Sequence, residues 1–517
     1  MVSTVRSELE NSIAIPNGGA IYVKDASSVT IDSDDNVFEY CFTSDRQGGA
    51  WNLRNININD NGSTYRYLGA KDGGAFYLQH TDLTLIDATF EEVSAENGGA
   101  IYVYGNTSVN LKDIDAVSVF AASKGGFMYI NGAATTSAQL LEIDGDFSLT
   151  SATLGEDGLG GGFYIDESLF TVDFTRELAS DSITADSVEQ GFLYLKNVGN
   201  VELDHGTFTA LSADADLGAF LHSVAPDLNL DVQNLEISCR GAAGNDFTSA
   251  TSLTYTSQET YLKSQQGTNG GAFLVRNDQT VNAQTSVVSA SNKVHGCYTA
   301  ATGGGWTLAS TDFSDSDSEY SYTAAVKGGV FYAENSELTL SDIAFTTHEA
   351  FQGGVAYLEH PQDTSFADVA GYDTGTGAFQ AYQFSDDGNG GVFYIVDELG
   401  TFGTYGASTP TLSLDNWQIQ LAHAEGNGGF AYVEVAELDV ELDTMVFEEL
   451  QADLSGGGFY AVTWDDVAMN DISVELTQAP DQGSFFYSLS AGSNIDITDS
   501  DFSCFAAAYD FATDLDG

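Results

Sequence analysis

The chain has 517 residues, of which 43% are hydrophobic, so it holds enough apolar side chains for a continuous core. Its 76 acidic residues outnumber 15 basic residues and give a formal net charge of −61. Binding to nucleic acid or to an anionic membrane surface requires a basic footprint, so this charge argues against both.

The N-terminal segment, Met1–Glu10, contains acidic residues and lacks the apolar core of a signal peptide. Since no run of about eighteen apolar residues occurs, we expect no membrane-spanning helix. The chain stops at Asp514–Gly517, shortly after a strand-like run. We therefore expect this sequence to be a mature or trimmed part of a larger protein.

From residue 18 onward, a short pattern recurs in which two glycines precede a small residue and an apolar strand with a central tyrosine. Clear copies are Gly18–Val23, Gly73–Leu78, Gly98–Val103, Gly328–Ala333, Gly353–Leu358 and Gly390–Ile395. Degenerate copies begin at Gly48, Gly125, Gly160, Gln190, Leu217, Gly270, Gly303, Gly428, Gly456 and Gly483. We call each copy a Gly-Gly strand. Glycine adopts positive φ readily, so we expect the pair to form a sharp corner in every coil.

The spacing of these copies predicts the fold. The shortest intervals are 25 residues, a period typical of leucine-rich repeats and parallel β-helices. No helix-length segment or leucine-rich consensus lies between copies, so we predict an all-β, right-handed parallel β-helix over residues 1–517. It should have about 16–18 coils, with two coils in the 53-residue interval between Leu217 and Gly270. Loop insertions are expected near 131–159, 241–268, 361–389 and 397–411.

Each coil contains two further strand-like pieces. The second piece alternates apolar and polar residues, as expected for a strand with one buried face. Examples are Leu83–Asp87, Val201–Asp204, Leu338–Asp342 and Leu438–Asp443. A third apolar position follows at Phe90, Phe208, Phe345 and Phe447. Three short strands per coil predict a triangular cross-section.

The central residue of the Gly-Gly strand is tyrosine in twelve copies, and alternation places it on the outer face. Stacking across a solvated face explains such a column, but an exposed aromatic stripe also suits a partner. We therefore predict partner binding at Tyr22, Tyr77, Tyr102, Tyr129, Tyr332, Tyr357, Tyr394, Tyr432 and Tyr460, with Tyr164, Tyr194 and Tyr487 in the same column.

An aspartate often follows the second strand, at Asp32, Asp87, Asp204, Asp231 and Asp342, and one residue away at Asp113, Asp173 and Asp443. Aspartate is a common turn residue because its side chain bonds nearby backbone groups. Stacked carboxylates would alternatively form a row suited to Ca²⁺, a hard cation. Ca²⁺ at the first five residues is therefore a candidate, and no other cofactor is expected.

Catalysis is not indicated by the remaining acidic residues. Adjacent carboxylates occur at Asp34-Asp35, Asp386-Asp387 and Asp465-Asp466, but such pairs carry little information in so acidic a chain. No histidine lies in a pattern that suggests a general base. We therefore predict that the chain is not an enzyme.

Cysteines and sequons bear on the compartment. Cys239 and Cys297 flank the longest interval and could pair, while Cys41 and Cys504 are expected to be free and buried. Sequons at Asn61 and Asn106 are compatible with N-glycosylation in a secreted protein.

From Gly18 to about Phe502, the Gly-Gly strands resemble the Gly-Gly-Ala-Ile repeats of chlamydial polymorphic outer-membrane proteins. They are also similar to the pectin-lyase-fold repeat proteins of ciliates and other protists. This resemblance implies a surface-exposed adhesive or scaffold role, with no catalytic residues to transfer.

We accordingly expect a structural or adhesive module at the cell surface or outside the cell. Its partners would be other copies, joined end to end or laterally, or glycans and other surface proteins. A filament or surface layer could result, since open strand edges invite stacking; seventeen coils would give an axial repeat of about 80 Å. The alternative is a carbohydrate-binding or carbohydrate-active β-helix, namely a polysaccharide lyase or hydrolase.

Overall fold

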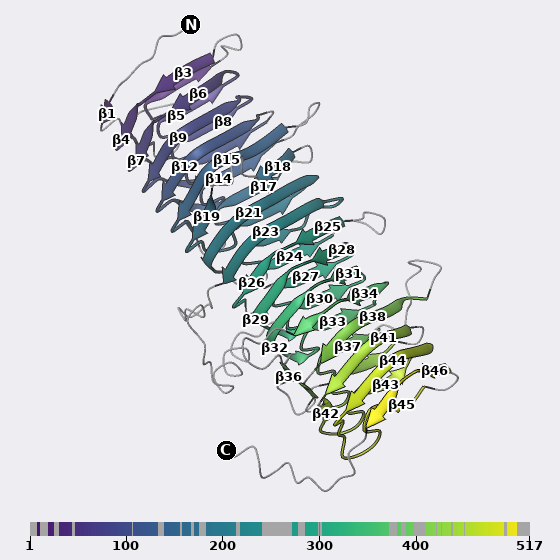
Figure 1. The fold of residues 1–517 in the computed structure, drawn as a ribbon. Helices are drawn as coiled ribbons and strands as arrows, with labels where there is room; N and C mark the ends of the chain where they lie inside the picture. Colours follow the sequence, from purple (N-terminus) through teal and green to yellow (C-terminus); the bar gives the residue numbers. More distant parts are fainter. Residues whose placement is uncertain are drawn as a thin grey trace, which may run out of the picture. The chain divides into compact units, whose positions relative to one another are not determined.

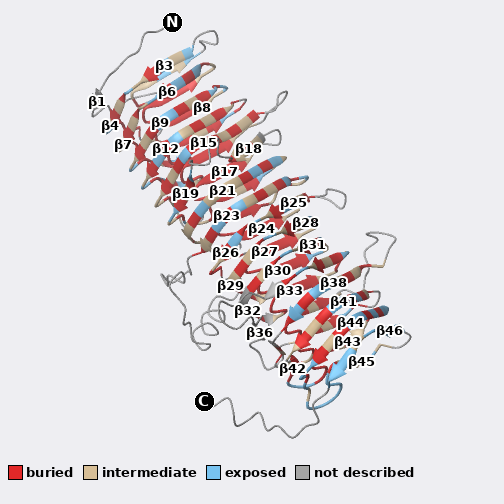
Figure 2. Ribbon diagram, in the orientation of Figure 1, coloured by how far each residue is buried: buried red, intermediate tan, exposed pale blue. Residues whose placement is uncertain are grey.

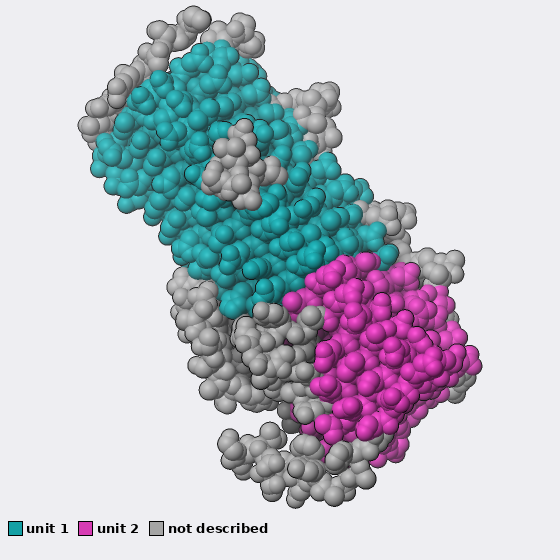
Figure 3. Space-filling model, in the orientation of Figure 1, with its two compact units in different colours: residues 1–326, 330–337 teal, residues 327–329, 338–517 magenta. Residues whose placement is uncertain are grey.

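Every regular element in the described part of the computed structural model is a β-strand, and none of the described residues forms a helix able to cross a membrane. The chain divides into two compact units, residues 1–326 with 330–337 and residues 327–329 with 338–517 (Figure 3). The structure describes residues 8–503 except 11–18, 25–29, 44–46, 106, 133–138, 156–157, 167–169, 175–181, 214–217, 240–270, 278–284, 298, 300–301, 372–379, 384–388, 398–408, 420, 425, 436–437, 449 and 491–493.

All sixteen Gly-Gly strands form, and they make up one class of parallel strand that we call the Gly-Gly sheet (Figure 1). The first unit contains β2 (Ile21–Lys24), β5 (Trp51–Arg54), β8 (Phe76–Gln79), β11 (Ile101–Tyr104), β14 (Met128–Asn131), β17 (Phe163–Asp166), β20 (Leu193–Lys196), β22 (Leu221–Ser223), β24 (Phe273–Arg276), β27 (Trp306–Ala309) and β30 (Phe331–Glu334). The second contains β33 (Ala356–Glu359), β37 (Phe393–Val396), β40 (Ala431–Glu434), β43 (Phe459–Thr463) and β45 (Phe486–Ser488). The predicted parallel β-solenoid is confirmed.

The second and third pieces of each coil also pair in parallel with their equivalents in neighbouring coils, while β10, β13 and β16 follow the third piece and form a separate three-stranded parallel sheet. In the first unit they are β1 (Glu8–Glu10), β3 (Thr30–Asp34), β4 (Val37–Glu39), β6 (Asn57–Asn61), β7 (Thr64–Arg66), β9 (Leu83–Glu91), β10 (Ser94–Asn97), β12 (Val109–Val117), β13 (Phe120–Lys124), β15 (Gln139–Thr150), β16 (Thr153–Leu154), β18 (Phe170–Phe174), β19 (Ile183–Asp186), β21 (Asn200–Leu211), β23 (Asn229–Cys239), β25 (Thr285–Ala290), β26 (Lys293–His295), β28 (Thr311–Ser316) and β29 (Glu319–Lys327). Later ones are β31 (Glu337–Ser341), β32 (Ala344–Gln352), β34 (Thr364–Ala367), β35 (Ala370–Gly371), β36 (Gln380–Gln383), β38 (Thr411–Ile419), β39 (Leu421–Ala424), β41 (Asp439–Glu448), β42 (Leu450–Ala452), β44 (Asp466–Glu475), β46 (Asn494–Thr498) and β47 (Asp501–Ser503).

The 53-residue interval holds one coil, so the prediction of two coils is wrong. β22 pairs directly with β24 through Leu221 and Phe273, and β23 pairs directly with β25 through Leu230 and Val287. Paired strands lie about 4.8 Å apart, which leaves no room for another strand between them. The extra length therefore belongs to a segment inserted within one coil.

Two of the predicted loop insertions contain strands. β15 and β16 lie within residues 131–159, and β34, β35 and β36 lie within residues 361–389. These insertions were predicted because the intervals from Gly125 to Gly160 and from Gly353 to Gly390 exceed the 25-residue period, yet part of the extra length forms strand. The segment 241–268 lies outside the described residues, as does most of 397–411.

The two glycines of the pair have different roles, as Gly73 and Gly74 illustrate. Gly73 has a φ of 67°, which confirms the predicted left-handed corner. Gly74 faces the next coil, and a Cβ added there would lie 2.1 Å from the carbonyl oxygen of Gly99. The first glycine thus provides backbone freedom, and the second allows close approach between coils.

Where the corner residues are described, a second left-handed corner separates the other two faces of the coil. In β9, Leu83 and Leu85 face the interior, Asp87 has a φ of 52°, and Ala88 and Phe90 again face the interior. The corner residue shifts the alternation by one, so both segments bury their apolar side chains. Along most of the described strands other than β46 and β47, interior positions are buried, and many outer positions are partly exposed (Figure 2).

Candidate functional site

The tyrosines predicted as a partner surface do lie in register on the Gly-Gly sheet. Tyr77, Tyr102, Tyr129, Tyr164 and Tyr194 pair in succession, as do Tyr357, Tyr394, Tyr432, Tyr460 and Tyr487 in the second unit. Neighbouring ring centroids lie 4.7 Å apart for Tyr164 and Tyr194 and 5.5 Å apart for Tyr432 and Tyr460. We call this row the Tyr column. Asn52, His222, Leu274 and Thr307 occupy its other positions.

The expectation of an exposed aromatic stripe is wrong for much of this column. Tyr77, Tyr129, Tyr164, Tyr332 and Tyr357 are buried, whereas Tyr22 in the first Gly-Gly strand is 42% exposed. The sequence placed these rings on the outer side of each strand but could not show that stacked neighbours cover one another's faces. Partner binding by the Tyr column remains a prediction, with less aromatic surface available than expected.

Three of the few basic side chains lie against the Tyr column. The Arg54 guanidinium is 5.4 Å from the ring centroid of Tyr77, and the Lys124 ammonium is 4.7 Å from that of Tyr164. Lys327 lies 4.3 Å from the ring of Tyr357. Such cation–π contacts stabilise the column. Burial raises the pKa of Tyr77 to about 12, so its hydroxyl stays protonated at neutral pH.

The five aspartates predicted as Ca²⁺ ligands occupy three different positions of the coil. Asp87 and Asp342 are corner residues with φ values of 52° and 54°. Asp32 and Asp231 lie on the outer face of the second strand, and Asp204 lies two residues beyond that position. Among the described residues, no group of three or more histidine, cysteine or acidic side chains is arranged to hold a metal ion.

Several of these carboxylates accept hydrogen bonds from side-chain amides. Asn59 Nδ2 donates to Asp32 at 3.1 Å, and Asn234 Nδ2 donates to Asp204 at 2.8 Å. The Gln233 amide likewise donates to Asp231 at 2.8 Å. An amide from the same or the next coil thus relieves the repulsion expected between stacked carboxylates.

One run of carboxylates does stack in consecutive coils. Glu142, Asp173, Glu202 and Asp231 are paired in register, and we call them the acidic column. Asn110 donates to Glu142 at 2.6 Å and ends the run. Burial, followed by the charges of Asp173, Asp231 and Asp204, raises the pKa of Glu202. Only Asp231 of this column was among the five predicted ligands.

A buried polar network was missed by the sequence analysis. Trp51 Nε1 donates to the Tyr65 hydroxyl at 3.2 Å, and that hydroxyl donates to Asp60 Oδ2 at 2.7 Å. The Asn36 backbone N–H donates to Ser63 Oγ at 3.1 Å, and Ser63 donates to Asp60 Oδ1 at 2.8 Å. The indole and backbone N–H groups can only donate, so each hydroxyl accepts from an N–H and donates its own hydrogen bond to the Asp60 carboxylate.

The same network recurs in a later pair of coils. Trp306 donates to Tyr320 at 2.8 Å, and Tyr320 and Ser318 donate to Asp315 at 2.6 and 2.7 Å. The Asn292 backbone N–H donates to Ser318 at 3.0 Å. Tryptophan, aspartate, serine and tyrosine have identical spacing in the two copies, which is the sequence signal that could have revealed them.

Asp60 and Asp315 are therefore carboxylates inside an apolar core. Burial raises the pKa of each, and hydrogen bonds from the surrounding serine and tyrosine hydroxyls lower it. The same environment raises the pKa of Tyr65 and Tyr320 well above the ordinary value. Both phenols consequently remain donors, and each network fixes two neighbouring coils in register.

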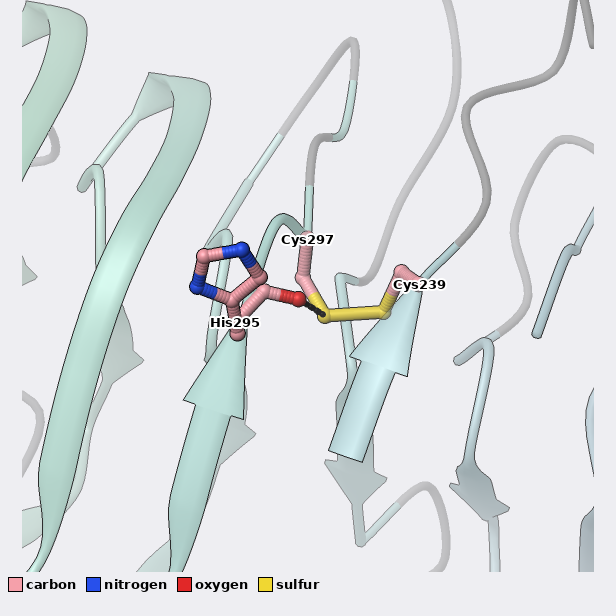
Figure 4. The surroundings of a disulfide bond; sticks show 3 residues. All are labelled: Cys239, His295 and Cys297. Atoms are coloured by element: carbon pink, nitrogen blue, oxygen red, sulfur yellow. Dashed lines mark hydrogen bonds between the residues drawn. A yellow bond between two sulfur atoms is a disulfide. The ribbon is translucent and has the colours of Figure 1, made fainter. Parts of the chain in front are cut away.

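Cys239 and Cys297 form the disulfide that the sequence suggested (Figure 4). Cys239 is the last residue of β23 and Cys297 lies two residues after β26; these strands pair through Ser238 and His295, so the bond joins adjacent coils. Cys41 is buried and forms no disulfide, as predicted, while Cys504 lies outside the described residues.

The predicted glycosylation sequons and the adjacent aspartate pairs do not form a common site among the described residues. The Asn61 side chain is exposed, but its sequon partner Ser63 is buried in the first network. Asn106 and the pair Asp386-Asp387 lie outside the described residues. Asp34-Asp35 and Asp465-Asp466 are on separate coils, and Asp35 is a corner residue.

Comparison of the chain with protein-family models, with curated proteins and with solved structures gave no match.

Proposed function

We propose that this chain is a non-catalytic structural or adhesive module of a cell-surface or extracellular assembly. The observation that carries the proposal is that its conspicuous polar and aromatic side chains contact their own equivalents one coil away. Neighbouring tyrosine rings of the Tyr column stack on one another. Carboxylates such as Asp32 and Asp204 accept hydrogen bonds from asparagine amides of the next coil. Side chains used in this way build a stable surface, whereas catalytic groups converge on a substrate.

A location outside the cell is supported by the disulfide between Cys239 and Cys297, because such bonds persist in oxidising compartments. The net charge of −61 keeps such a module soluble through repulsion between copies. Its proposed partners are other copies, joined end to end or laterally, glycans or other surface proteins. Ca²⁺ on the acidic column remains a proposed ligand.

The second candidate is a carbohydrate-binding or carbohydrate-active solenoid. The half-buried Tyr394, Tyr432, Tyr460 and Tyr487 favour it, because tyrosine edges and hydroxyls can contact sugars. Their ring faces, however, are stacked on one another, with interplanar angles of 7°, 9° and 25° for the three successive pairs. Sugar rings normally bind aromatic faces, so this column suits edge contacts only.

Localisation and activity together test the structural proposal. Antibodies against the chain should label intact cells or the extracellular matrix without permeabilisation. The purified protein should leave acidic and neutral polysaccharides uncleaved, as measured by reducing ends and by ultraviolet absorbance of unsaturated products. Labelling confined to permeabilised cells would contradict the location, and sustained cleavage would establish the second candidate instead.

A further inference from the structure

The last described coil repeats the sequence of the coil that carries Cys239. Residues 482–504 align with residues 217–239 without a gap, and seven positions are identical, namely Gly483, Phe485, Ser488, Asn494, Asp496, Ser503 and Cys504. The left-handed corners coincide as well, at Asp499 with a φ of 49° and at Asn234 with a φ of 54°. Each cysteine lies five residues after its corner, so Cys504 has the sequence position of Cys239.

The first coil repeats the coil that carries Cys297. Three identical residues lie 256 positions apart in the two coils, namely Ser33 and Ser289, Asn36 and Asn292, and Cys41 and Cys297. The Cys41 sulfur lies 3.5 Å from the Glu39 carbonyl oxygen, and the Cys297 sulfur lies 3.6 Å from that of His295 (Figure 4). The two cysteine side chains therefore have the same orientation in their coils.

The order of these coils differs between the interior and the ends of the chain. In the interior, the Cys239 coil is followed by the Cys297 coil and then by the coil that contains the Trp306 network. The first two coils of the chain carry Cys41 and the Trp51 network, in the same order. The coil that should precede them, by this pattern, is the last coil of the chain. Placing the last coil of one copy against the first coil of another would restore the interior order.

The last coil also lacks the cover that its interior counterpart has. The strands β45, β46 and β47 each pair with a described strand on one side only. Ile495, Ile497 and Phe502 are 47%, 48% and 41% exposed. Their interior counterparts are buried beneath β25 and β26, namely Leu230, Val232 and Ile237. Apolar strands with an unpaired edge are templates for strand addition.

We propose that the first coil of a second copy covers this edge, and that Cys504 of one copy forms a disulfide with Cys41 of the next. The strands β45, β46 and β47 would pair with β2, β3 and β4 of the second copy. Their register would be that of β22 and β23 on β24, β25 and β26. This inference rests on the proposed function, in which copies join end to end in an oxidising compartment, and it adds the two surfaces and the covalent bond.

The interior junction shows a second contact that the joint would reproduce. Asn292 Nδ2 donates to the Val232 carbonyl oxygen at 2.8 Å, and Asn292 Oδ1 accepts from the Leu235 N–H at 2.8 Å. Asn292 thus fixes the Cys297 coil to the corner of the Cys239 coil. In the joint, Asn36 would bind the equivalent groups of the last coil, the Ile497 carbonyl and the Ser500 N–H.

Formation of the disulfide needs an oxidant, and a small disulfide such as oxidised glutathione supplies it. One cysteine thiolate attacks this disulfide, forms a mixed disulfide and releases one small thiol. The other cysteine thiolate then attacks the protein sulfur of the mixed disulfide and releases the second small thiol. Two protein thiols are oxidised, one small disulfide is reduced to two thiols, and the two protons pass to those thiols.

Two features of the first coil oppose the joint. β1 pairs with β4 over three residues and holds the place that β47 would take, so β1 has to detach. The residue after β1 is Asn11, where the interior coil has Cys239. Asp32 would also lie over Asp496, and repulsion between these carboxylates should make the association depend on salt. At about 1 M salt the Debye length is about 3 Å, so this repulsion is screened.

The bond is tested on the full chain at about 1 M salt in a mixture of oxidised and reduced glutathione. The wild-type chain should give a ladder of linked species on non-reducing electrophoresis, and reduction should return it to the monomer. Cys41→Ser and Cys504→Ser should each stay monomeric, because each variant keeps one half of the joint. An equal mixture of the two should give dimers and no larger species, and mass spectrometry should find Cys41 bonded to Cys504.

Three results would overturn this inference: a wild-type chain that stays monomeric, dimers of one variant alone, or a Cys41–Cys504 bond within a single chain. None of them bears on the location of the protein, which labelling of intact cells decides. A chain confined to the cell interior would conversely still form the ladder in glutathione. The failure of one proposal is therefore distinguishable from the failure of the other.

A variant next to β1 tests the register separately. Asn11→Cys places a thiol where the interior coil has Cys239, so it should bond to Cys41 within one chain and suppress the ladder. Asn11→Ser is the matched control, and its ladder should equal that of the wild-type chain. Equal ladders from the two variants would show that β1 and β47 do not share one position on β4 and would refute the proposed register.

Discussion

Removing one hydroxyl from the second buried network should destabilise its coils severely. In Tyr320→Phe, Asp315 loses a donor at 2.6 Å and Trp306 Nε1 loses its acceptor at 2.8 Å. A hydrogen bond to a charged group contributes about 1.5–3 kcal/mol, and a buried unsatisfied N–H costs about 1–3 kcal/mol. We therefore expect a loss of about 3–5 kcal/mol, because the phenyl ring leaves both groups in an apolar core.

The assay has to be local, because a repeat array does not unfold as one cooperative unit. Hydrogen exchange of β28 and β29 amides should accelerate by about two to three orders of magnitude at about 1.4 kcal/mol per tenfold. Tyr65→Phe should produce the same loss in β6 and β7 and leave β28 unchanged. Tyr40→Phe, on an exposed ring stacked on Tyr67, is the matched control and should change little.

This reasoning would be refuted by a Tyr320→Phe protein whose β28 and β29 amides exchange within about threefold of wild type, since threefold corresponds to about 0.7 kcal/mol. Such a result would mean that water or a side-chain rearrangement satisfies Asp315 and Trp306 at no cost. The Tyr65 variant then distinguishes a local accident from a general property, because its network has the same donors and acceptors.

Three further measurements test other parts of the structure. Replacing Cys239 and Cys297 with serine should destabilise the coils around β23 and β26 by about 4 kcal/mol for their 58-residue separation, seen as faster proteolysis there; unchanged cleavage would contradict this. Burial, followed by the charge of Arg276, lowers the pKa of His222 to about 4 from 6.5, so its contribution to stability is present above pH 6.5 and is lost as the pH falls toward 4. Between pH 6.5 and pH 4, the wild-type coil should lose about 3 kcal/mol of stability through His222, and His222→Phe should not show this loss. Hydrogen exchange of the β22 amides, corrected for the intrinsic effect of pH, measures it. A variant whose stability depends on pH as the wild type's does would contradict the prediction. Ca²⁺ should slow exchange in β21 and β23 if the acidic column binds it, and identical exchange with chelator would eliminate that ligand.

The Gly-Gly pattern was sufficient to predict the strand type and the number of copies. The local sequence of each copy is enough to predict its strand, because glycine allows the corner and the alternation after it decides which side chains face inward. All sixteen predicted starts are followed by a strand of the Gly-Gly sheet. The Cys239–Cys297 pairing was also within reach, since both cysteines flank the one interval that departs most from the repeat.

Contacts between coils could not be obtained in the same way. The sequence gives the outward direction of Tyr77 and Tyr357 but not the stacked rings that bury them. In the sequence, Asp32 and Asp87 look like similar turn aspartates. In the structure, Asp32 accepts a hydrogen bond from the Asn59 amide, whereas Asp87 is a left-handed corner residue. These outcomes depend on what lies one coil away, roughly 25 residues along the chain.

Register is the quantity that only the tertiary structure decided. Trp51, Asp60 and Tyr65 read as ordinary core or turn residues until the strands are aligned and a single carboxylate collects their hydrogen bonds. Local sequence specifies each strand because its period is intrinsic to the backbone, whereas insertions of variable length hide which residues of successive coils meet.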